Sequence, residues 1–270
     1  GGRLRVGVPH SSPHDRRGSV PPVTNDRAGP GFEDPIAAIA TASGAAGLAV
    51  VRLSGARAVA IADAVFQGSG SLAAAAGNTL HHGWAVGPGV AAHANGAEAR
   101  RIDEVVVALF RAPRSYTRED VVEISCHGGR LPARGVLDAL LLAGARLARP
   151  GEFTLRAFLS GRIDLAQAEA VADVIHAETE AARELALAQL AGGLSRRLEA
   201  VSERVTDALA EVEARVDFAE DVGGVEVPPH VIDAVAAAGR ELAALLDGAA
   251  FAGAVREGVR VPIVGRPNVG

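Results

Sequence analysis

Residues 149–175 constrain the fold most, because their pattern predicts two helices joined by a tight connector. Pro150-Gly151 is a turn pair, and apolar residues recur at helical spacing from 153 to 158. Gly161 should end this short helix in the left-handed conformation that glycine adopts without strain. Strand-like patterns dominate before this stretch and helical patterns follow it, so it divides the chain into two parts.

The second helix of this stretch has a recognisable start. Asp164 is expected to accept from free backbone N–H groups, and Gln167 to reach back to the backbone of Asp164. Helical spacing then predicts one apolar face, made of Leu165, Ala168, Val171, Ala172 and Ile175. Arg162 lies in the connector. It is either a solvated arginine or a partner for an anion, since arginines and helix N-termini both favour negative charge.

The front part alternates strands and helices. Strands are expected at 36–40, 48–53, 80–86, 102–110 and 119–127, because β-branched residues cluster there between turn signals. Ser54 is expected to cap a helix whose buried face is Ala58, Ile61, Ala62 and Val65. A second helix over 131–143, closed by Gly144, should bury Val136, Leu137, Leu140 and Leu141.

Two charged residues interrupt the apolar strands. Arg52 either extends its charge to solvent or meets an anion. Glu123 shares a strand face with Val121 and Ser125, where a carboxylate is costly unless paired. It could pair with a nearby arginine, or it could accept from the adjacent N–H and amine of a pterin ring, two parallel donors that suit a carboxylate.

The histidines and the single cysteine do not form a catalytic or metal pattern. His81 and His82 are neighbours on one strand and therefore face opposite sides, as do Cys126 and His127, so neither pair predicts a shared site. Cys126 is expected to be a small buried residue. Residues 1–33 are rich in Pro, Gly, Ser and Arg and are expected to be disordered, and His10 and His14 are too few for a metal site.

The back part reads as helical. Apolar residues step by three or four from Thr179 to about Ala219, which is typical of a bundle or coiled-coil seam. Gly192-Gly193 should kink or closely pack this helix. A break follows at 220–224, and the helix after Pro228-Pro229 should face inward with Val231, Val235, Leu242 and Leu245.

The last residues resemble the start of a nucleotide-binding loop. A strand at 260–264 leads into Gly265-Arg-Pro-Asn-Val-Gly270, which matches the first six of the eight positions of a Walker A loop. In such loops glycines let backbone N–H groups wrap phosphates, a lysine supplies charge and a hydroxyl holds magnesium.

The amino-acid composition argues against several classes of protein. The net charge of −5 and the isoelectric point near 5.9 argue against a generally basic nucleic-acid surface, although a local patch could still bind RNA. One cysteine excludes an internal disulfide framework and fits a reducing cytosol, so a cytoplasmic protein is expected. No apolar run reaches the roughly 20 residues of a membrane helix, so no membrane association is expected.

Two long segments resemble the MnmE/TrmE family, GTPases that modify wobble uridines of tRNA. They are Arg149–Ala170, RPGEFTLRAFLSGRIDLAQAEA, and Arg114–Gly129, RSYTREDVVEISCHGG, in which Arg118 stands where glycine is common. The residues 51–55 and the Pro-Asn-Val-Gly ending are similar as well. The turn at 42–47 departs from the family: it reads ASGAAG where PPGRGG is usual, which removes an arginine.

The resemblance implies a fold and a set of binding residues. The expected fold class is α+β: an N-terminal α/β folate-binding and dimerisation domain at 34–150, an incomplete helical bundle domain at 151–258, and the first strand and partial P-loop of a G domain at 259–270. Arg52, Glu123 and Arg162 would bind a tetrahydrofolate derivative, in the 5-formyl or methylene form. Gly265, Asn268, Val269 and Gly270 would bind GTP, with Asn268 also contacting potassium.

The family further implies a homodimer, the flavoprotein partner MnmG, a tRNA substrate, and GTP, Mg²⁺ and K⁺ as ligands of the full-length protein. These 270 residues are expected to be inactive as a GTPase, with no catalytic residue among them. Two other interpretations remain open. A folate-dependent aminomethyltransferase would share the front domain, and a non-enzymatic helical interaction module beside a P-loop domain would need no folate.

Overall fold

The computed structural model describes residues 33–87, 100–218, 224–257, 262, 264 and 265. Several sequence predictions fall outside this range: the disorder of 1–32, the two histidines within it, most of the helix break at 220–224, and the P-loop residues Asn268, Val269 and Gly270. Gly265 lies within the described residues but in no helix or strand. The described residues form seven helices and one seven-stranded sheet.

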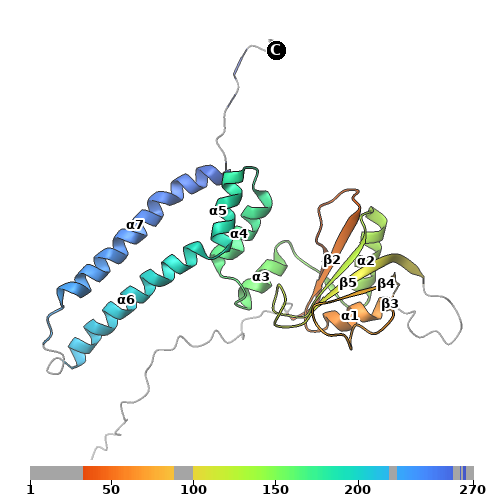
Figure 1. The fold of residues 1–270 in the computed structure, drawn as a ribbon, viewed down its shortest axis with the longest axis horizontal. Coiled ribbons are helices and arrows are strands. Elements are labelled where there is room, and N and C mark those ends of the chain that lie inside the picture. Colours follow the sequence, from red (N-terminus) through yellow and green to blue (C-terminus); the bar gives the residue numbers. More distant parts are fainter. Residues whose placement is uncertain (1–32, 88–99, 219–223, 258–261, 263, 266–270) are drawn as a thin grey trace, which may run out of the picture. The chain divides into compact units, whose positions relative to one another are not determined.

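The sheet has the order β3-β4-β5-β6-β2-β1-β7, as Figure 1 illustrates for its labelled strands. Its pairs are antiparallel except for the parallel pair of β1 and β7. The strands are β1 (Ile36–Ile39), β2 (Leu48–Ser54), β3 (Phe66–Gly68), β4 (Thr79–Val86), β5 (Arg101–Phe110), β6 (Val121–His127) and β7 (Arg146–Leu147). The five strands expected before residue 130 are confirmed, while the two shortest, β3 and β7, were not predicted. The strand expected at 260–264 is not found at residues 262 and 264, and the other three residues of that range lie outside the described residues.

Helices α1 (Ala58–Ala64) and α2 (Arg130–Leu142) pack on one face of the sheet. Their buried residues join alternate residues of β2, β5 and β6 in a single hydrophobic core. The predicted inner residues of both helices are confirmed, except that Leu141 of α2 is only partly buried. Side chains on the other face of the sheet are more accessible: Leu48 is 66% exposed and Leu80 73% exposed. The sheet therefore has one closed face and one open face.

Ser54 does not cap α1, contrary to the sequence prediction. The residue before α1 is Arg57, and no side chain caps this helix. Ser54 is instead the fully buried last residue of β2, and its hydroxyl is 2.7 Å from the hydroxyl of Thr117 and donates to Glu119 at 2.7 Å. The Ser54 hydroxyl therefore binds residues more than 60 positions away in sequence and does not cap the N-terminus of α1.

The connector region matches its prediction closely. Helix α3 (Glu152–Leu159) is followed by Gly161 at φ +69°, and α4 (Leu165–His176) begins with a complete capping box between Asp164 and Gln167. The predicted apolar face of α4 is wrong in part, because its first and last members, Leu165 and Ile175, are 61% and 72% exposed. Only Ala170 is fully buried in α4.

The helical part continues with α5 (Glu180–Leu190), α6 (Gly193–Asp217) and α7 (Pro229–Glu257). The helical run expected from Thr179 to about Ala219 is divided into two helices at Gly192, where a kink or close packing was predicted. Gly192 adopts φ +79°, outside helical geometry, and the chain turns there between α5 and α6. Helices α6 and α7 then lie side by side (Figure 1).

The seam of the helical part is only partly buried. Val201, Ala208 and Val231 are buried as expected. Val235 and Leu242 of α7 were expected to face inward, yet they are 49% and 40% exposed, and Val216 of α6 is 73% exposed. Helical spacing identified a continuous apolar stripe, but within the described residues the helices cover only part of it.

Candidate functional site

Arg52 and Glu123 form an ion pair on the open face of the sheet. They are direct cross-strand partners of β2 and β6. The Arg52 Nε donates to Glu123 Oε1 at 2.8 Å, and Nη2 lies 2.7 Å from the same oxygen. Arg52 therefore meets an anion, and Glu123 pairs with a nearby arginine, because each residue is the other's partner. Each side chain remains 27% exposed, so the pair is open to a ligand.

Two aromatic rings flank the Arg52 guanidinium. Its carbon lies 5.3 Å from the ring centre of Tyr116 and 5.6 Å from that of Phe153, within range of a cation–π interaction. The Tyr116 hydroxyl lies 2.9 Å from the Thr154 hydroxyl, which ties the loop after β5 to α3. Neither ring was predicted from the sequence to lie beside Arg52. Their signal was available, since Tyr116 and Phe153 lie inside the two segments that carried the resemblance.

A buried chain of charges holds these rings in place. Arg156 of α3 is 4% exposed and donates to both carboxylate oxygens of Glu119, at 3.2 and 3.1 Å. It also donates to Glu152, which is itself 4% exposed and accepts from Arg146 at 2.7 Å. Because Glu119 lies three residues after Tyr116, and Arg156 three residues after Phe153, the Arg156–Glu119 pair fixes the two ring-bearing segments together.

Glu152 is the most strongly perturbed acid of this chain of charges. The hydrogen bond from Arg146 lowers the pKa of Glu152 to about 2, against the opposing effect of burial. The backbone N–H of Arg149 and the guanidinium of Arg156 add to the same stabilisation of the carboxylate. Glu152 is therefore ionised at neutral pH.

Arg162 is not joined to the Arg52–Glu123 pair. It is exposed on the connector between α3 and α4, and within the described residues its side chain forms no hydrogen bond or ion pair. A second arginine lies beside this connector: Arg118 donates to the carbonyl of Ser160 at 3.0 Å. Arg118 adopts φ +61°, a left-handed conformation that glycine adopts without strain.

Cys126 and His127 point apart, as their adjacency predicted. Cys126 is 1% exposed, and burial, with a smaller contribution from Asp103, raises its pKa to about 11. A thiol in this state is a poor nucleophile. The His127 side chain is 68% exposed, and its Nδ1 is 2.7 Å from Asp103. No cluster of three or more metal-binding side chains occurs within the described residues.

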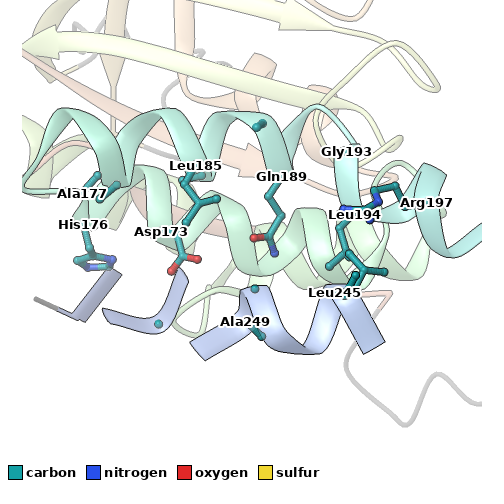
Figure 2. A pocket seen from close by; sticks show the side chains of 16 residues that line it. Asp173, His176, Ala177, Leu185, Gln189, Gly193, Leu194, Arg197, Leu245 and Ala249 are labelled. Atoms are coloured by element: carbon teal, nitrogen blue, oxygen red, sulfur yellow. The ribbon is translucent and has the colours of Figure 1, made fainter. Parts of the chain in front are cut away.

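A cavity of about 650 Å³ lies among α4, α5, α6 and α7 (Figure 2). Alanine, glycine and leucine make up most of its walls, with Asp173, His176, Gln189 and Arg197 among the polar exceptions. The amide of Gln189 is already engaged with the carbonyl of Ala166. The cavity shares no residue with the Arg52–Glu123 site.

Comparison with known proteins finds a matching family model for each of the two parts of the chain. Residues 35–162 match the family described as "GTP-binding protein TrmE N-terminus", and residues 165–260 match "MnmE helical domain". The chain is 42% identical over 241 residues to the tRNA modification GTPase MnmE of Alkaliphilus oremlandii. It is 45% identical to the MnmE of Symbiobacterium thermophilum and 47% identical to that of Chloroflexus aurantiacus.

These alignments cover 88% of this chain but only 50% of each of the three relatives. The chain therefore spans about half the length of the curated relatives that it matches. Within the described residues, no helix is both long and apolar enough to cross a membrane.

Proposed function

Since this chain belongs to the MnmE family of tRNA modification GTPases, we propose that its sheet part binds a reduced folate carrying a one-carbon unit. In this proposal the longer protein acts with the flavoprotein MnmG and uses that carbon to build a carboxymethylaminomethyl group on the wobble uridine of certain tRNAs. Hydrolysis of GTP, with Mg²⁺ and K⁺, drives its domain motion. The protein works in the cytoplasm as a homodimer formed through the N-terminal domain.

The Arg52–Glu123 pair carries the folate part of the proposal. Reduced folates present a pterin ring with hydrogen-bond donors and acceptors along one edge, and a carboxylate beside a guanidinium offers the complementary groups. Tyr116 and Phe153 supply flat apolar surface next to those polar groups. A polar ring ligand needs this combination, and the residues present fit it.

Arg162 has a distinct part in the proposal. Its exposed guanidinium on the α3–α4 connector would contact an anionic portion of the ligand, such as the glutamate tail, rather than the pterin edge. Gly265, Asn268, Val269 and Gly270 would form the first part of the GTP-binding loop, with Asn268 also at the potassium ion. The helical part would pack against helices from the remainder of the longer protein.

Calorimetric titration with 5-formyl-tetrahydrofolate tests the folate proposal. We expect saturable binding that Arg52→Ala and Glu123→Ala each weaken by about 1–3 kcal/mol, the cost of losing a charged hydrogen bond. Arg134→Ala is the matched control, because Arg134 also pairs with a carboxylate, Asp138, on the exposed surface of α2. This control should bind like the unaltered chain.

Two results would count against the proposal. Absence of binding by a folded chain would remove the one-carbon role from these residues and favour the interaction-module interpretation. Binding that ignores both substitutions would place the folate elsewhere on the molecule.

A further inference from the structure

Helix α3 packs on the sheet part through charged side chains. Its buried residues are Glu152, Arg156 and Ala157, whereas Leu155 and Leu159 are 41% and 53% exposed. A surface helix ordinarily buries an apolar stripe instead. Because charged side chains are rarely buried unless they are paired, the position of α3 depends on the partners of these two charges.

One of these partners, Glu119, joins α3 to the strand that carries Arg52. Arg156 Nη1 donates to both carboxylate oxygens of Glu119, at 3.2 and 3.1 Å. Oε2 of Glu119 also accepts from the hydroxyl of Ser54 at 2.7 Å, and Ser54 lies two residues after Arg52 on β2. A single carboxylate therefore links β2 to α3, and both of its oxygens are engaged within the protein.

The ring of Phe153 makes a second contact between α3 and β2. Phe153 lies three residues before Arg156, so the two side chains are neighbours on one face of the helix. The ring centre is 5.6 Å from the guanidinium carbon of Arg52. Helix α3 and β2 are therefore joined at two places, by the carboxylate of Glu119 and by the ring over Arg52.

We propose that Arg156 is a positioning residue of the candidate site. By binding Glu119 it fixes α3, and this keeps the Phe153 ring against the Arg52 guanidinium. Arg156 itself does not reach a ligand, because it is 4% exposed and donates to Glu119 and Glu152. This inference rests on the proposed folate site and specifies which buried contact keeps that site assembled.

The contact depends on the shape of the guanidinium as well as on its charge. Nη1 of Arg156 donates to Glu119, while Nη2 donates to Glu152 at 3.3 Å. The ammonium of a lysine is one compact charge on a flexible stem, so it cannot offer two nitrogens in a fixed geometry to two carboxylates. Arg156→Lys therefore keeps the buried positive charge but loosens the packing of α3.

Hydrogen exchange tests the inference without a ligand. We expect Arg156→Lys to make the backbone amides of α3 exchange at least about 10-fold faster, because local release of the helix becomes easier. Glu119→Gln changes the same contact from the sheet side and should act in the same direction. Val136→Ala, which removes buried apolar atoms of α2, is the control: it should accelerate exchange in β5 and leave α3 unchanged.

Two exchange results would overturn the inference. Unchanged exchange of α3 in Arg156→Lys would mean that this contact does not hold the helix. Acceleration of α3 by Val136→Ala as large as that by Arg156→Lys would mean that α3 opens only together with the whole core.

A double-mutant cycle connects the contact with ligand binding. In calorimetric titration with 5-formyl-tetrahydrofolate, Arg156→Lys and Phe153→Ala should each weaken binding by about 3- to 10-fold, the loss expected for one aromatic contact. The two changes together should weaken binding no more than Phe153→Ala alone, because Arg156 acts through the ring. Losses that multiply would contradict the inference, and Val136→Ala should bind like the unaltered chain.

The two measurements separate this inference from the folate proposal. If a folded chain bound no folate while the exchange of α3 still depended on Arg156, the folate proposal would fall and the positioning of α3 by Arg156 would stand. If the folate bound and Arg156→Lys changed neither its affinity nor the exchange of α3, the inference would fall and the folate proposal would stand.

Discussion

The sheet part and the helical part bury their apolar residues to very different extents. In the sheet part, Val51 and Leu140 are fully buried, and the buried core is continuous from β2 to α2. In the helical part, Val216 and Leu246 are 73% and 74% exposed, and each of α4 and α5 has a single fully buried alanine. Strands that pair through the backbone and two helices packed on one face can close a core within about 120 residues. Helices gain burial only from neighbours, and here some faces have none within the described residues.

The buried charges of the sheet part should give the largest response to mutation. Arg156→Met leaves Glu119 and Glu152 without their shared guanidinium, so we expect a loss of about 3–5 kcal/mol in unfolding free energy. Urea unfolding followed by the fluorescence of Trp84, the single tryptophan and a residue of β4, would measure it. Adding Glu119→Gln should restore part of the loss, and a mutant as stable as the unaltered chain would show that the network contributes little.

A pair of leucine truncations compares the two parts directly. Leu140→Ala in α2 removes a fully buried side chain and should cost about 2–5 kcal/mol. Leu198→Ala in α6 removes one that is 42% exposed and should cost less than about 1 kcal/mol. Trp84 fluorescence reports the first, and far-ultraviolet circular dichroism, dominated by helix, reports the second. Equal costs would mean that the helical seam is covered in solution.

Acid should weaken the sheet part through Glu152. Its pKa is about 2 in the folded chain against an ordinary 4.5, so its contribution to stability is complete above pH 4.5 and is lost as the pH falls toward 2. The shift corresponds to about 3 kcal/mol at most. Glu152→Gln should flatten this part of the pH profile measured by Trp84 fluorescence. An unchanged acid limb in the mutant would assign acid unfolding to other carboxylates.

Substitutions at residues with left-handed backbone, one in each part, should have the smallest effects on stability. The two effects should be opposite in sign. Arg118→Gly relieves φ +61° in the sheet part but loses the bond to Ser160, so we expect a stabilisation of less than about 1 kcal/mol. Gly192→Ala forces a side chain onto φ +79° in the helical part and should destabilise it by about 1–2 kcal/mol. Thermal unfolding would detect both. Stabilisation by Gly192→Ala would mean that α5 and α6 merge into one helix.

Local signals predicted the connector well. The capping box of Asp164 and Gln167 and the left-handed Gly161 involve residues within a few positions of each other, so the sequence alone specified them. The same reasoning failed for Ser54, whose hydroxyl binds Thr117 and Glu119 instead of a helix N-terminus. The contacts that decided this are 63 and 65 residues apart in sequence, beyond the reach of any local pattern.

The sequence by itself determined five of the seven strands, the start of α4 and the family of this protein, because backbone propensity, capping and characteristic segments are local properties. It also singled out Arg52 and Glu123 as charges that needed partners. Only the tertiary structure decided that these residues, 71 positions apart, are each other's partner, and that Tyr116 and Phe153 flank them. Strand register and the docking of α3 bring these groups together, and both depend on the free energy of packing the whole sheet part rather than on any one segment.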